Sequence, residues 1–234
     1  MAPIAAPPAR RGPIVLCLGL ILLYPLLSVA MQGSIQHLSS TTGELGARVL
    51  TETAIWLYAA IVLAIALFWE QRSLASIGLR YPTLATAGFG IGAALAITAV
   101  GGASAYVVYG LLHQPQHAEA QAAAIARGSV VYALCLAVRA GALEELLFRG
   151  LAIEQLTRLT GRRWLAASLA TLAFIGLHAL RFDWVQLIPI ATASIVLTVL
   201  YLWRRDLLAN MIAHIAVDAT GLVLLALRTH QLTH

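Results

Sequence analysis

The chain has 234 residues, of which 60% are hydrophobic and only 11% charged, and its mean hydropathy is +0.84. In soluble domains about a quarter of all residues are charged, so this composition excludes an ordinary soluble domain. All basic residues are Arg and are scattered between apolar runs, which argues against a nucleic-acid partner despite the net charge of +5. The complete lack of Lys is typical of a GC-rich, bacterial genome.

About seven apolar runs, each close to the roughly 20 residues that a membrane-spanning helix needs, follow one another along the chain. They cover residues 13–31, 53–69, 84–112, 128–148, 164–180, 187–203 and 207–227. Because a bilayer offers no water to unpaired backbone groups and no alternating barrel pattern occurs, the runs predict helices. The expected fold class is an all-α, polytopic transmembrane helix bundle.

Three parts are expected along the chain. Residues 1–12, rich in Pro and Ala, are predicted to be disordered, residues 13–127 to hold three spans, and residues 128–228 to form a bundle of four spans. The polar stretches 32–52 and 113–127 are predicted to be surface loops or short interfacial helices. The first run also fits a signal peptide, but a retained helix is favoured because further spans follow.

Arginine counting predicts the topology. With the N-terminus inside, nine arginines lie in inside loops and four in outside loops, which favours a cytoplasmic N-terminus and an external C-terminus. The inside set is Arg10, Arg11, Arg72, Arg80, Arg158, Arg162, Arg163, Arg204 and Arg205, and the outside set is Arg48, Arg127, Arg181 and Arg228. The expected location is the cell membrane, as a multi-pass protein of the bacterial inner membrane.

Ionisable side chains inside the apolar runs are costly and mark functional sites. The first group is Glu144-Glu145-Leu-Leu-Phe-Arg149. Glu145 and Arg149 are four positions apart, so the two share a helix face and can pair, whereas Glu144 lies about 100° around the helix and stays available. The Glu145 carboxylate is therefore expected to be structural, and the Glu144 carboxylate to take part in the chemistry.

The second group, Phe174-Ile-Gly-Leu-His178, lies level with the first. Residues 128–160 read as one long helix that turns at Gly161, and both Glu144 and His178 are 17 residues from that glycine. At about 1.5 Å per residue both stand roughly 25 Å from the turn. The counting predicts that they meet across an antiparallel hairpin.

The third group forms a polar stripe on the last apolar run. Asn210, His214 and Asp218 follow one another at a spacing of four residues. A stripe facing lipid would be untenable, so it is predicted to face the bundle interior near the depth of the other two groups.

The three strings EELLFR, FIGLH and HIAVD resemble the EExxxR, FxxxH and HxxxN/D motifs of the CPBP family, the CAAX-protease and bacteriocin-processing group. The resemblance covers about residues 140–221, and SIGLR at residues 76–80 adds to it. It implies a glutamate-dependent intramembrane endopeptidase. The residue matching Glu144 would activate water with help from the one matching His178, and those matching His214 and Asp218 would form the oxyanion hole.

The remaining motif residues would support the site under this resemblance. Glu145 and Arg149 match its supporting pair, and Phe174 and Asn210 are placed with them. Neutral His214 can donate from one ring nitrogen, whereas an ionised Asp218 has no proton to give. Asp218 is therefore either protonated in its apolar setting or orients His214 as an acceptor, and the second role is favoured.

Two other functions stay open from the sequence. The carboxylates and histidines are an adequate ligand set for a metal-dependent membrane hydrolase with zinc, although HExxH is missing. The same groups could serve a proton relay in a transporter or a non-enzymatic scaffold. The favoured interpretation is a peptide hydrolase without a cofactor. Its expected partners are the lipid bilayer and a membrane-associated or exported peptide. The active site is expected to lie nearer the outer face of the membrane.

Overall fold

The computed structural model describes residues 11–112 and 130–232, all in helices and short connections. The N-terminal stretch predicted to be disordered lies outside the described residues except for its last two positions, which already belong to α1 (Arg11–Ala64). The polar stretch 113–127 and Arg127 also lie outside the described part. The predicted all-α membrane bundle is confirmed.

Helix α1 is a hairpin of two antiparallel arms, because Gly43 takes a left-handed conformation (φ 74°) and reverses the chain. The expectation of loops or short interfacial helices over 32–52 is therefore wrong. Hydroxyl groups of Ser34, Ser40, Thr41 and Thr42 bond back to carbonyls three or four residues earlier, so these polar side chains are satisfied without leaving the helix.

The second arm ends in a π-helical turn, η1 (Ile65–Trp69), followed by the 3₁₀ helix η2 (Leu74–Ile77). Helix α2 (Leu84–Leu112) then crosses back along the molecule. A continuous helical rod follows, made of α4 (Val130–Glu144), the π-helical η3 (Glu145–Ala152) and α5 (Ile153–Thr160). The chain closes with α6 (Arg163–His178), α7 (Trp184–Arg204) and α8 (Leu207–Leu232).

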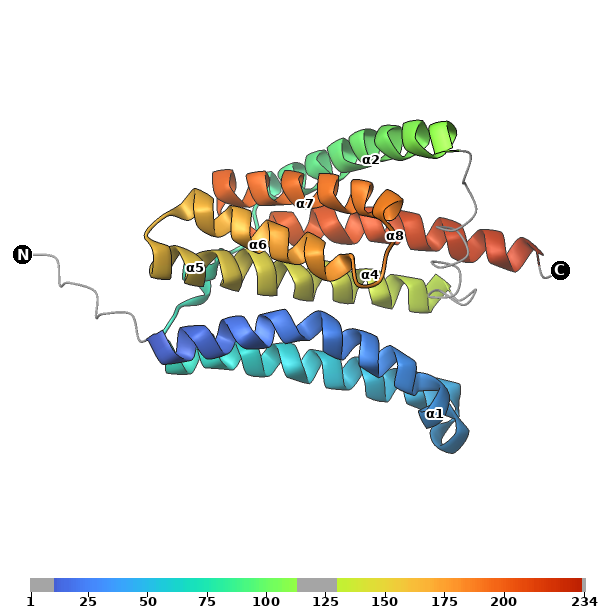
Figure 1. Ribbon diagram of the computed structural model, residues 1–234, viewed down its shortest axis with the longest axis horizontal. Coiled ribbons are helices and arrows are strands. Elements are labelled where there is room, and N and C mark those ends of the chain that lie inside the picture. The colour runs from blue at the N-terminus through green and yellow to red at the C-terminus, as the bar shows by residue number, and fades with distance from the viewer. Residues whose placement is uncertain (1–10, 113–129, 233–234) are drawn as a thin grey trace, which may run out of the picture.

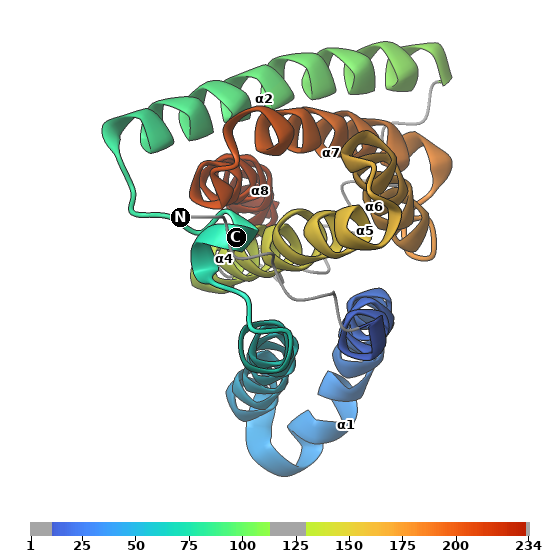
Figure 2. The same ribbon diagram turned by 90° about the vertical axis from the view of Figure 1, so that its left-hand side faces the viewer.

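Helix α8 lies at the centre of the bundle, between α2 on one side and α4 on the other (Figure 2). The α1 hairpin covers the opposite side of the rod from α2 (Figure 1). Gly90 lets α2 approach α8 closely, because a Cβ there would lie 2.8 Å from the Ile212 side chain. Large apolar side chains such as Leu84, Leu172 and Trp164 remain exposed, as expected of a surface that faces lipid.

Four described segments are long and apolar enough to cross a membrane, namely Arg11–Ile35, His37–Trp69, Leu84–Val108 and Trp184–Arg204. Arg163–His178 and Leu207–Val223 are shorter apolar helices. The span expected over 128–148 carries Arg139, Glu144 and Glu145, so it is too polar to face lipid on all sides. The chain is a multi-pass membrane protein.

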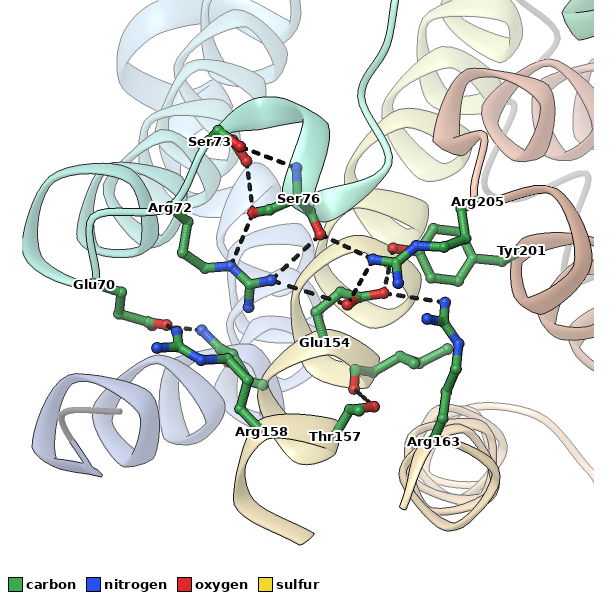
Figure 3. A network of polar contacts seen from close by, with 12 residues as sticks. Glu70, Arg72, Ser73, Ser76, Glu154, Thr157, Arg158, Arg163, Tyr201 and Arg205 are labelled. Carbon is green, nitrogen blue, oxygen red and sulfur yellow. Dashed lines mark hydrogen bonds and ion pairs between the residues drawn. The ribbon is translucent and has the colours of Figure 1, made fainter. Parts of the chain in front are cut away.

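A polar network ties several helix ends together at one end of the bundle (Figure 3). Glu154 of α5 pairs with Arg205 at 2.8 Å and with Arg163 at 3.3 Å, and accepts a hydrogen bond from the Tyr201 hydroxyl. Arg205 also donates to the Ser76 carbonyl of η2. This network fixes the arginine-rich end and holds the SIGLR segment against the turn between α7 and α8.

Candidate active site in the bundle

Glu144 and His178 face each other at the ends of α4 and α6. The His178 Nε2 atom lies 3.9 Å from Glu144 Oε2, as the residue count from Gly161 predicts. Both side chains are mostly buried, with exposed fractions of 21% for His178 and 17% for Glu144. His178 Nδ1 lies 2.8 Å from the Phe174 carbonyl, which can only accept a hydrogen bond. Neutral His178 therefore carries its proton on Nδ1 and presents a lone pair at Nε2.

Glu145 is fully buried and belongs to a different set of partners. Its Oε1 atom lies 2.8 Å from Arg149 Nη1 and 2.8 Å from His214 Nδ1, and its Oε2 accepts from the Asn210 amide. Asn210 also donates to the Leu197 carbonyl. The Glu145 carboxylate thus joins η3 to α8, while the neighbouring Glu144 is left to the cavity.

Phe174 and Arg149 hold this arrangement in place from α6 and η3. The Arg149 guanidinium stacks over the Phe174 ring at 4.5 Å and donates to the Ser194 hydroxyl at 2.8 Å. The Phe174 ring also packs edge-on against Phe148 and lies beside the His178 ring. One aromatic side chain therefore contacts both the structural ion pair and the candidate catalytic histidine.

His214 of α8 is placed between two carboxylates. Its Nδ1 bonds to Glu145, and its Nε2 lies 3.5 Å from Asp218 Oδ2, one turn further along the helix. Because the Glu145 bond uses the Nδ1 proton, a neutral His214 would have no second proton to donate. Donation from Nε2 requires the imidazolium form, with Glu145 and Asp218 as its counter-charges.

These side chains surround a cavity of about 270 Å³. Its walls come from α2, α4, α6, α7 and α8 and are apolar apart from one cluster. The polar lining residues are Arg139, Glu144, His178, Arg181, Ser194, His214 and Asp218. The three sequence groups therefore do converge on one cavity, with Glu145, Arg149 and Asn210 behind its wall.

Sequence reasoning did not place Arg139 or Arg181 at this cavity, and it did not find the partners of Arg139 on α1. Arg139 Nε lies 3.1 Å from Glu52, and Arg139 Nη1 lies 3.4 Å from the hydroxyls of Tyr24 and Ser28. Burial and the nearby Arg139 lower the pKa of Arg181 in the turn after α6, while Glu144 acts in the opposite direction. A buried Arg in an apolar run was the available clue, and its partners lie more than 80 residues away.

Over residues 11–112 and 130–232, no group of three or more His, Cys, Asp and Glu side chains is arranged to hold a metal ion. Cys17 is buried and Cys135 exposed, and neither forms a disulfide.

Comparison with protein families matches residues 126–220 to the family described as type II CAAX prenyl endopeptidase Rce1-like. The matched segment contains the groups around Glu144, His178 and His214, so the resemblance to the CPBP family is confirmed. No curated protein and no solved structure matches the chain. The α1 hairpin and the whole of α2 lie before the matched segment.

Proposed function

We propose that this membrane protein is a peptide hydrolase of the type that the match over residues 126–220 indicates, and that it cleaves with water activated by Glu144. The observation that carries the proposal is the pair of acceptors facing each other across the cavity wall. Glu144 Oε2 and His178 Nε2 are 3.9 Å apart, a separation that one water molecule bridges by donating a proton to each.

The reaction follows from this pair. The water oxygen attacks the peptide carbonyl carbon while Glu144 takes one of its protons, which gives a tetrahedral oxyanion. The C–N bond then breaks, and the leaving amine takes the proton from Glu144, so the products are a carboxylic acid and an amine. Glu144 returns to its starting state, and His178 orients the water through its Nε2 lone pair.

His214 is the proposed donor to the oxyanion. As an imidazolium it can turn its Nε2 proton from Asp218, at 3.5 Å, to the developing charge, while Nδ1 stays bonded to Glu145. Asp218 then orients His214 before the substrate binds and balances its charge. This supports the orienting role of Asp218 over a protonated, donating one.

The proposed substrate is a peptide segment at or in the membrane. A cavity of about 270 Å³ inside the bundle suits a short extended segment rather than a folded domain. The proposed location is the cell membrane of a bacterium, and no cofactor is needed for the steps above.

The test is Glu144→Gln, which keeps shape and hydrogen bonding but removes the base. We expect cleavage of an internally quenched peptide ending in a prenylated Cys and three further residues to fall below detection, with normal membrane insertion. Glu44→Gln, on the exposed turn of α1, is the matched control and should keep full activity. Near-normal turnover by the Glu144 variant would disprove the assigned base, and no turnover by the wild type would contradict a CAAX-type substrate.

The same assay distinguishes the metal-dependent alternative. Excess chelator should leave wild-type turnover unchanged, because the proposed steps use only side chains and water. Loss of turnover that added zinc restores would instead favour a metalloenzyme.

A further inference from the structure

A second, smaller cavity lies on the α1 side of Glu144. Its volume is about 50 Å³, and its wall from the first arm of α1 includes Tyr24 and Ser28. Glu144 and His178 line this small cavity and also the large one, and together with Arg181 and Phe182, which line both as well, they separate the two. Groups in the small cavity can therefore reach Glu144 and His178 from the side opposite the large cavity.

The chemistry of the small cavity suits water. A cavity of this size has room for on the order of one or two water molecules, and a buried water needs about two to four polar partners. Five polar side chains border it, namely Tyr24, Ser28, Glu144, His178 and Arg181. The Glu144 carboxylate and neutral His178 Nε2 are acceptors, whereas the two hydroxyls can donate.

The hydroxyl protons of Tyr24 and Ser28 are directed by Arg139. Its Nη1 atom donates to both hydroxyl oxygens at 3.4 Å, and within residues 11–112 and 130–232 both hydroxyls act only as acceptors. A hydroxyl that accepts from a guanidinium keeps its own proton for another partner. Arg139 is itself held by Glu52 of the second arm, so both arms of the hairpin fix these two hydroxyls.

We propose that this small cavity supplies and orients the hydrolytic water, with Tyr24 and Ser28 of the α1 hairpin as its positioning residues. The hydroxyl of Tyr24 or Ser28 donates to one lone pair of this water, and Glu144 and His178 accept the two water protons. The second lone pair of the water then faces the substrate carbonyl in the large cavity. This inference rests on the proposed role of Glu144. It assigns part of the active site to a hairpin outside the matched segment 126–220.

The kinetic test compares two Tyr→Phe changes on the same hairpin. Tyr24→Phe removes the positioning hydroxyl, and we expect kcat for the prenylated quenched peptide to fall about 10- to 100-fold with KM within about twofold. Tyr58→Phe is the matched control: its hydroxyl bonds the Leu20 carbonyl, and its ring lies 6.5 Å from that of Tyr24. It should keep kcat within about twofold, since its hydroxyl does not border the cavity.

The second measurement does not depend on activity. An experimental structure of the full chain at a resolution that shows waters should contain one in the small cavity, within hydrogen-bond distance of Glu144 and of Tyr24 or Ser28. Equal kcat losses in both Tyr variants, or a dry cavity in the wild type, would overturn the inference. These outcomes leave the proposed function standing if Glu144→Gln is still inactive, whereas an active Glu144→Gln contradicts the proposed function itself.

Discussion

Glu144 and Glu145 are adjacent in the chain but have opposite surroundings. Glu144 borders two cavities, whereas Glu145 is completely buried and contacts three partners from η3 and α8. A buried ion pair is costly to break because the remaining charge has no water to solvate it. We therefore assign a catalytic role to Glu144 and a structural role to Glu145, although both are glutamates.

At this scale we predict that Glu145→Gln lowers the amount of folded protein. Removal of one partner of a buried pair costs about 3 to 5 kcal/mol, since Arg149 and His214 lose their shared carboxylate. The measurement is the unfolding midpoint of purified protein in detergent. The exposed Glu44–Arg48 pair has the same i, i+4 spacing, so Glu44→Gln should cost about 0.5 kcal/mol or less. Equal losses in both variants would contradict the structural role of Glu145.

At the scale of elements, the π-helical η3 follows directly after Glu144. A wider turn shifts the direction in which each later side chain points, and such turns occur mostly at functional sites. Here it lets Glu145 reach α8 while Arg149 reaches Ser194 of α7. The regular helix expected over 128–160 predicts the Glu145–Arg149 pair but not these two partners.

Helix α4 approaches α8 at Gly141, one turn before Glu144. A Cβ at this position would lie 2.7 Å from the Ile215 backbone nitrogen, which cannot move aside as a flexible side chain can. We predict that Gly141→Ala separates α4 from α8, destabilises the protein by about 1 to 3 kcal/mol and lowers turnover. Thermal unfolding and the peptide assay measure both effects.

Gly176 of α6 provides the matched control for this prediction. No atom lies within 4 Å of a Cβ built there, so Gly176→Ala should keep activity and stabilise the helix by up to about 1 kcal/mol. A Gly141 variant as stable and active as the Gly176 variant would show that the close contact is unimportant.

At the scale of the whole molecule, the site lies away from the arginine-rich end. His178 is the last residue of α6, whereas Arg163 is the first and joins the network of Figure 3. Arginine-rich ends face the cytoplasm in most membrane proteins. The site is therefore predicted to lie nearer the outer face, which suits an exported substrate.

Cysteine labelling tests this orientation in intact cells. In a Cys17→Ala, Cys135→Ala background, an impermeant thiol reagent should label Leu180→Cys but not Thr160→Cys, because these exposed positions lie just outside the opposite ends of α6. Both variants should be labelled after permeabilisation. Labelling of Thr160→Cys alone in intact cells would reverse the topology and remove the case for an exported substrate.

The sequence by itself determines the helical class and the level at which Glu144 and His178 meet. These properties depend on apolar run length and on a fixed rise per residue, which act locally along the chain. The same local geometry predicts the Glu145–Arg149 pair, whose partners are one turn apart.

Only the tertiary structure decides which distant helix completes the site. The contact between Arg139 and Glu52 joins residues from separate helices, and no periodicity within either helix predicts it. The hairpin at Gly43 brings both arms of α1 to α4, and with them the hydroxyls of Tyr24 and Ser28. In the membrane interior, buried polar groups must find partners wherever packing brings the helices together, so the second wall of the site depends on the whole bundle.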